Sequence, residues 1–259
     1  MLLALIKADF YQMRSRKGLW LLLGLIVLLT AGIVWIAVNV MKEEHIIATQ
    51  NIANLVLFGA PQWVLEPLTM IIVFLAQIVS FNNDNKNRTL INTVSYGTPR
   101  PMIFIGKVAA TFLTTVIIYS SILLTLCIAL SILTPNIAVQ DMGNLWRSYW
   151  LPALPIWLAF STLFSILPLI TKSNGAQVFL FILVSNVGSV LKLIELFVIR
   201  QSESFKWLTD AKWLLTRLST RSPLHFGSLT FDFTAVVALV YVLIFAAIGI
   251  TLFKRSEIK

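Results

Sequence analysis

Residues Phe81 to Lys107 read FNNDNKNRTLINTVSYGTPRPMIFIGK and form the longest polar interruption in the first half of an otherwise apolar chain. The stretch lies between two apolar runs and contains one acidic residue, Asp84. Its basic residues are Lys86, Arg88, Arg100 and Lys107. Because loops rich in Lys and Arg stay on the cytoplasmic side of a membrane, this pattern predicts a cytoplasmic loop between two membrane spans.

The middle of this loop has the pattern of a short helix. Residues Thr89 to Ser95 place Leu90, Ile91 and Val94 on one helical face. Tyr96-Gly97 and then Pro99 predict the end of this helix, since glycine favours helix termination and proline disfavours a helical residue before it. A short cytoplasmic helix with an apolar face is expected to bind a groove on another protein.

The loop resembles that of the permease subunits of type-2 ATP-binding-cassette exporters. In that family the loop between the second and third spans reads acidic-x-Lys-x-Gly-Thr, then apolar residues, Ser-Tyr or Ser-Pro, and a later Arg. This chain has Asp84 where the family usually has Glu, and Arg88 where it usually has Gly. Chain length, predicted span number and the N-terminal helix also fit, so the resemblance covers essentially the whole chain.

The resemblance implies that the loop is a coupling helix, which binds a separate cytoplasmic ATPase and passes nucleotide-driven motion to the spans. The coupling residues expected on this basis are Asp84, Arg88, Thr89, Leu90, Ile91, Val94, Ser95, Tyr96 and Arg100. It also implies two copies of the ATPase, which hold ATP and Mg, and a second permease copy or paralogue. The alternative from charge alone is an ordinary basic loop.

Composition places the chain among integral membrane proteins. Of its 259 residues, 58% are hydrophobic and 12% charged, and the mean hydropathy is +0.87. Too few polar residues remain to cover a water-facing surface. The net charge of +9 comes from basic residues at the ends of apolar runs, which indicates lipid headgroups rather than nucleic acid as their partners. The one cysteine, Cys127, permits no internal disulfide.

The apolar runs predict one all-α membrane domain over residues 1–259. We expect it to cross the plasma membrane several times, with both termini in the cytoplasm. Residues 1–17 are amphipathic and predict an interfacial helix, with a signal peptide as the alternative. The predicted coupling loop is 82–103. Six spans, each needing about 20 apolar residues, are predicted at 19–40, 63–81, 104–133, 150–170, 176–199 and 233–253.

Two outer segments leave alternatives open. Asn186, Lys192 and Glu195 in the fifth predicted span either line a translocation surface or form an ion pair that reaches the outer headgroups. Their place in the outer third of the span favours the ion pair. Residues 200–231 combine aromatic and basic side chains, which predicts extracellular interfacial or re-entrant helices before the last span.

The sequence contains no motif for its own catalysis. Gly106-Lys107-Val108 lacks the Ser or Thr and the earlier glycine of a phosphate-binding loop, so we expect no enzyme activity and no cofactor bound by this chain. We expect an exporter subunit that moves an amphipathic antimicrobial peptide, drug or lipid-like molecule outward. The alternative is an ion-coupled transporter or a non-transporting immunity protein without an ATPase. Ion coupling normally needs acidic residues within the membrane, and Glu195 is the acid that lies well inside a predicted span.

Overall fold

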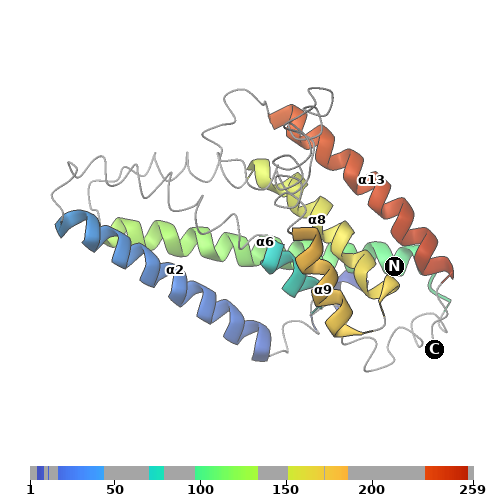
Figure 1. Ribbon diagram of the computed structural model, residues 1–259, viewed down its shortest axis with the longest axis horizontal. Helices are drawn as coiled ribbons and strands as arrows, with labels where there is room; N and C mark the ends of the chain where they lie inside the picture. Colours follow the sequence, from blue (N-terminus) through green and yellow to red (C-terminus); the bar gives the residue numbers. More distant parts are fainter. Residues whose placement is uncertain are drawn as a thin grey trace, which may run out of the picture.

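The computed structural model describes residues 5–8, 11, 17–43, 70–78, 97–133, 151–171, 173–185 and 231–255. Within these ranges the chain is helical and has no strand, which confirms the predicted all-helical class (Figure 1). The named helices are α2 (Lys17–Glu43), α6 (Arg100–Leu133), α8 (Leu151–Ile170), α9 (Asn174–Ser185) and α13 (Phe231–Arg255). Residues 70–78 form a further helical segment.

Three of these helices are long and apolar enough to cross a membrane, over Arg100–Ala129, Ala153–Ile170 and Ala235–Arg255. They fall on the third, fourth and sixth predicted spans. Two apolar stretches are shorter, Leu23–Ile36 in α2 and Gly175–Ser185 in α9. The described residues thus support a membrane protein, and the full six-span topology stays a prediction.

Helix α8 lies at the centre of the described bundle. It packs against α6, α9 and most extensively α13, whereas α2 packs along α6 (Figure 1). Helix α8 is continuous although Pro155 and Pro168 lie inside it, and an interior proline removes one backbone hydrogen bond. The predicted fourth span is therefore one helix, Leu151–Ile170, which its two interior prolines do not divide.

The main core lies where α8 meets α13, α9 and the segment 70–78. Phe74 contributes the most specific contacts, with ring centroids 4.2 Å from Phe181 in a stacked pair and 5.8 Å from Phe164 in an edge contact. Such aromatic pairs add to the stabilisation from apolar burial. The buried residues of this core are Met70, Val73, Phe74, Ile156, Ala159, Phe160, Phe164, Leu167 and Ala238.

Helices α6 and α8 run antiparallel. Tyr119 in the middle of α6 contacts Trp157 near the start of α8, with ring centroids 4.2 Å apart. Phe104, near the start of α6, clusters with Ile166 near the end of α8. This arrangement agrees with opposite crossing directions for the third and fourth predicted spans.

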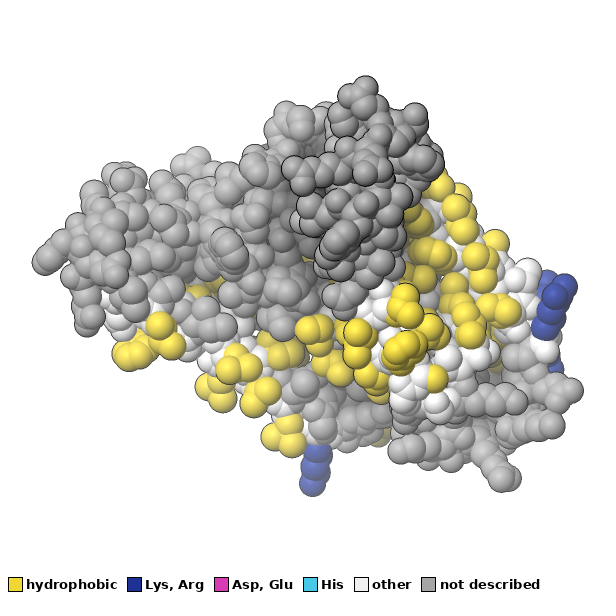
Figure 2. Space-filling view, in the orientation of Figure 1, with side chains coloured by type: hydrophobic (Ala, Val, Ile, Leu, Met, Phe, Trp, Pro, Cys, Tyr) yellow, Lys and Arg dark blue, Asp and Glu magenta, His cyan; other side chains and the backbone are white. Residues whose placement is uncertain are grey.

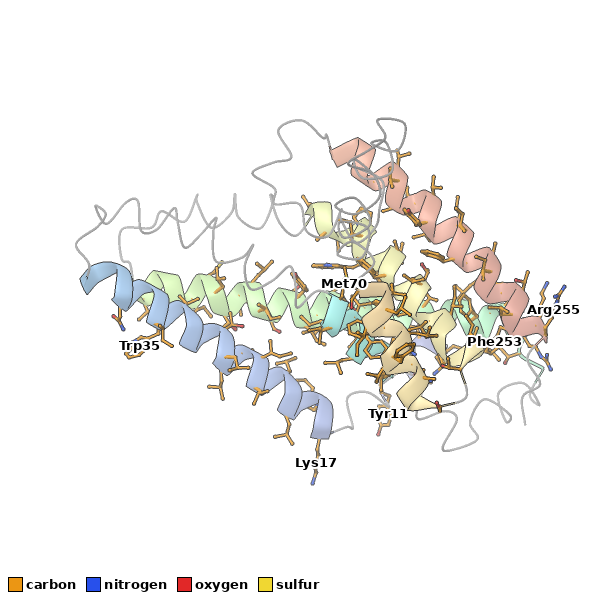
Figure 3. All side chains as sticks on the ribbon, in the orientation of Figure 1. Tyr11, Lys17, Trp35, Met70, Phe253 and Arg255 are labelled. Carbon is orange, nitrogen blue, oxygen red and sulfur yellow. The ribbon has the colours of Figure 1, made fainter. Side chains whose placement is uncertain are left out.

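Much of the described surface is apolar (Figure 2). On α13 the exposed large hydrophobic residues recur at helical spacing. They are Val236, Leu239, Val240, Leu243, Ile244 and Ile248. The exposed basic residues of α2 and α13 instead lie at helix ends, as Figure 3 shows for Lys17 and Arg255. Apolar flanks with basic ends are typical of helices whose middle faces lipid.

Candidate functional site

Residues 97–103, the turn before α6 and its first helical turn, are the part of the predicted coupling loop that the structure describes. Arg100 is the first residue of α6, whereas the sequence predicts the span to begin at Phe104. The reason is the turn before it: Gly97 adopts a φ of 79°, and the Pro99 carbonyl accepts hydrogen bonds from the Met102 and Ile103 N–H groups at 2.9 and 3.3 Å. Pro101 follows in the first helical turn, where a missing N–H costs nothing.

The other predicted site residues lie outside the described residues. For the coupling set these are Asp84, Arg88, Thr89, Leu90, Ile91, Val94, Ser95 and Tyr96. For the possible translocation surface they are Asn186, Lys192 and Glu195. The interfacial segment 200–231 is described only at its last residue. These assignments remain predictions.

Arg100 contacts the far end of the chain. Its guanidinium donates a 2.8 Å hydrogen bond to the backbone carbonyl of Lys254, 154 residues away and in the last turn of α13. The last four carbonyls of a helix have no partner within that helix, and a cation there is favoured by the helix dipole. Arg100 therefore caps the C-terminal end of α13.

One turn further along α6, Phe104 fills the space beside Gly249 of α13. A Cβ on Gly249 would overlap the Phe104 Cζ and lie 2.7 and 2.8 Å from Cε1 and Cε2. The Phe104 ring is buried and also packs against Phe253, with centroids 6.3 Å apart. Because Gly249 has no side chain, the two helices approach closely enough for this contact. The sequence pattern did not predict this contact.

The N-terminal segment also reaches α6. Residues 5–8 are helical, and a Cβ on Gly106 would lie 3.6 Å from the Leu5 Cβ, an ordinary packing distance. Lys7 is exposed and Ile6 is half-buried, as an amphipathic helix requires. The start of α6 is thus a meeting point for the N-terminal helix, α8 and α13.

A second polar feature lies inside the bundle, and we call it the polar seam: Thr111 and Thr115 on α6, and Ser161 and Ser165 on α8. All four are fully buried. They lie one and two turns from the Tyr119 to Trp157 contact, and because the helices are antiparallel these turns face each other. The hydroxyl spacing of four residues in each apolar run is a sequence signal for this seam, although the seam was not among the predicted sites.

Two of the four hydroxyl groups of the polar seam form hydrogen bonds. Thr115 Oγ1 donates to the Thr111 carbonyl at 2.9 Å, and Ser165 Oγ donates to the Ser161 carbonyl at 2.6 Å. The hydroxyls of Thr111 and Ser161 have no partner among the described residues, nor has the buried amide of Gln77. Buried polar groups without partners are costly, above all where no bulk water can reach them.

Comparison with known proteins adds no family assignment. No protein-family model matches the chain, and no curated protein matches its sequence. Within the described ranges, no group of three or more His, Cys, Asp or Glu side chains is placed to hold a metal ion.

Proposed function

We propose that this chain is the membrane-spanning permease subunit of a type-2 ATP-binding-cassette exporter. It sits in the plasma membrane with both termini in the cytoplasm and pairs with a second permease. Two copies of a separate ATPase hydrolyse ATP with Mg, and the permease pair moves an amphipathic peptide, drug or lipid-like molecule outward.

The observation that supports this proposal best is the continuity of α6. Its 34 residues give a rod about 51 Å long at 1.5 Å per residue. The hydrocarbon core of a bilayer is about 30 Å thick, so α6 can cross it and still project beyond it. The rod begins at Arg100, which lies inside the predicted coupling loop 82–103. A displacement of Arg100 by an ATPase would therefore be carried into the membrane interior along one continuous helix.

Charge at the same end supports the cytoplasmic placement. Arg100 lies at the start of α6, and Lys254 and Arg255 lie in the last turn of α13. The Arg100 to Lys254 hydrogen bond brings these two helix ends together. Basic residues gathered at one end of a membrane helix pair favour the cytoplasmic side.

The test is whether a reading frame beside this chain encodes a soluble ATPase with a Walker motif, and whether that ATPase binds the chain. Leu90→Asp and Val94→Asp place a charge on the apolar face predicted for the coupling helix. Asn92→Asp is the matched control, because it adds the same charge on the opposite face of the same helix.

Wild type and Asn92→Asp are expected to co-purify with the ATPase and to stimulate its ATP hydrolysis, whereas both apolar-face variants lose these properties. The proposal fails if Leu90→Asp and Val94→Asp keep normal binding and stimulation. The absence of any such ATPase binding to the wild-type chain would favour a transporter or immunity protein that works without one.

A further inference from the structure

The start of α6 and the end of α13 are joined by three contacts, which we call the α6–α13 clamp. Arg100 donates to the Lys254 carbonyl, Phe104 packs against Phe253, and Phe104 lies against the bare backbone of Gly249. Arg100 and Phe104 are four positions apart on α6, and Gly249 and Phe253 are four positions apart on α13, so each pair lies on one helical face. The clamp thus joins the first turns of α6 to the last turns of α13.

We propose that the clamp makes the end of α13 follow the start of α6, so that α13 moves with the coupling loop during the ATPase cycle. This inference rests on the proposed function, since it needs a force applied to the loop before Arg100. Phe104 and Gly249 act as positioning residues, which transmit a displacement between the two helices.

Burial explains why the clamp can carry this displacement. In the apolar stretch of α13, 17% of the residues are buried, against 56% in the apolar stretch of α8. Among the described helices, α13 packs mainly against α8 and, at the clamp, against α6. The C-terminal part of α8 also contacts the clamp, because Ile166 packs in one buried cluster with Ile103, Phe104, Val108 and Phe253. A close-packed contact of this kind has no space in which α6 can move alone.

A single added methyl group at Gly249 is expected to disrupt the packing of the clamp. In Gly249→Ala the new Cβ overlaps the Phe104 ring, and the buried ring cannot swing aside without displacing its neighbours. All the ring atoms in the way, Cζ, Cε1 and Cε2, are absent from leucine. The double variant Phe104→Leu with Gly249→Ala therefore removes the overlap. Gly32→Ala in α2 is the matched control, because a Cβ there meets nothing within 4 Å.

The experiment measures the distance between spin labels on α2 and α13, in the complex of full-length chain and ATPase. Labels at Leu21→Cys and Leu243→Cys sit on exposed positions, in a Cys127→Ala background that removes the one native cysteine. Each variant is measured without nucleotide and after trapping with ATP and vanadate. Co-purification of the ATPase is scored on the same samples.

Wild type and Gly32→Ala are expected to show a nucleotide-dependent shift of the label distance. Gly249→Ala should lose that shift while still binding the ATPase, and the double variant should regain it. The inference is overturned if Gly249→Ala shifts like wild type, if the double variant does not recover, or if wild type binds the ATPase without any shift. A wild-type chain that binds no ATPase would overturn the proposed function itself, and this inference with it.

Discussion

Gln77 offers a direct test of whether the bundle interior is dry. It lies on the same helical face of segment 70–78 as Met70, Val73 and Phe74, and it is fully buried. Neither its Nε2 nor its Oε1 has a hydrogen-bond partner among the described residues. Leaving a buried polar group unsatisfied costs about 1–3 kcal/mol. Gln77→Met replaces both groups by apolar atoms in a side chain of similar length.

We expect Gln77→Met to raise the free energy of unfolding by at least about 0.5 kcal/mol, since the two unsatisfied groups together cost about 2–6 kcal/mol and repacking costs less than about 1.5 kcal/mol. The assay is reversible unfolding in mixed micelles. Ile72→Met is the matched control, because Ile72 is buried in the same helical segment but contributes no polar group. A loss of stability in Gln77→Met that exceeds the loss in Ile72→Met would refute the reasoning and indicate that water or a polar ligand group satisfies the amide.

Two further predictions concern α8 and use the same unfolding assay. Ser165→Ala removes a 2.6 Å hydrogen bond within α8 and should lower the free energy of unfolding by about 0.5–1.5 kcal/mol. Ser161→Ala removes a hydroxyl without a partner among the described residues and should not lower it; equal losses in both variants would contradict this. Trp157→Ala empties the buried site beside Tyr119 and should cost about 3–5 kcal/mol, and a cost below about 1 kcal/mol would show that the two helices do not pack there.

Apolar length predicted the helices well. The predicted third span and α6 end at the same residue, Leu133, and the predicted fourth span and α8 end at Ile170. The first residues of the helices were harder to predict, because a proline either ends a helix or lies in its first turn. Pro101 is compatible with the first turn of a helix, so α6 extends back to Arg100. At the start of α9, Ser173 Oγ accepts a hydrogen bond from the Ala176 N–H, so Asn174 and Gly175 are already helical although the fifth span is predicted to begin at residue 176.

The contacts between helices could not be predicted in the same way. The hydrogen bond from Arg100 to Lys254 joins residues 154 positions apart, and its existence depends on how α6 crosses α13. Gly249 is one glycine in an apolar run, and its role emerges only from the Phe104 ring beside it. Sequence periodicity assigns residues to faces of single helices, but it does not say which faces meet.

The central claim, that the loop before α6 lies in the cytoplasm where an ATPase can bind it, is tested most directly by labelling Asn92. In a Cys127→Ala background, Asn92→Cys is treated with a membrane-impermeant maleimide in intact cells and in inverted membrane vesicles. Glu44→Cys serves as the opposite control, because it lies between the first and second predicted spans and is therefore predicted to face the outside of the cell. We predict that Asn92→Cys is labelled only in inverted vesicles and Glu44→Cys only in intact cells; labelling of Asn92→Cys in intact cells would contradict the account.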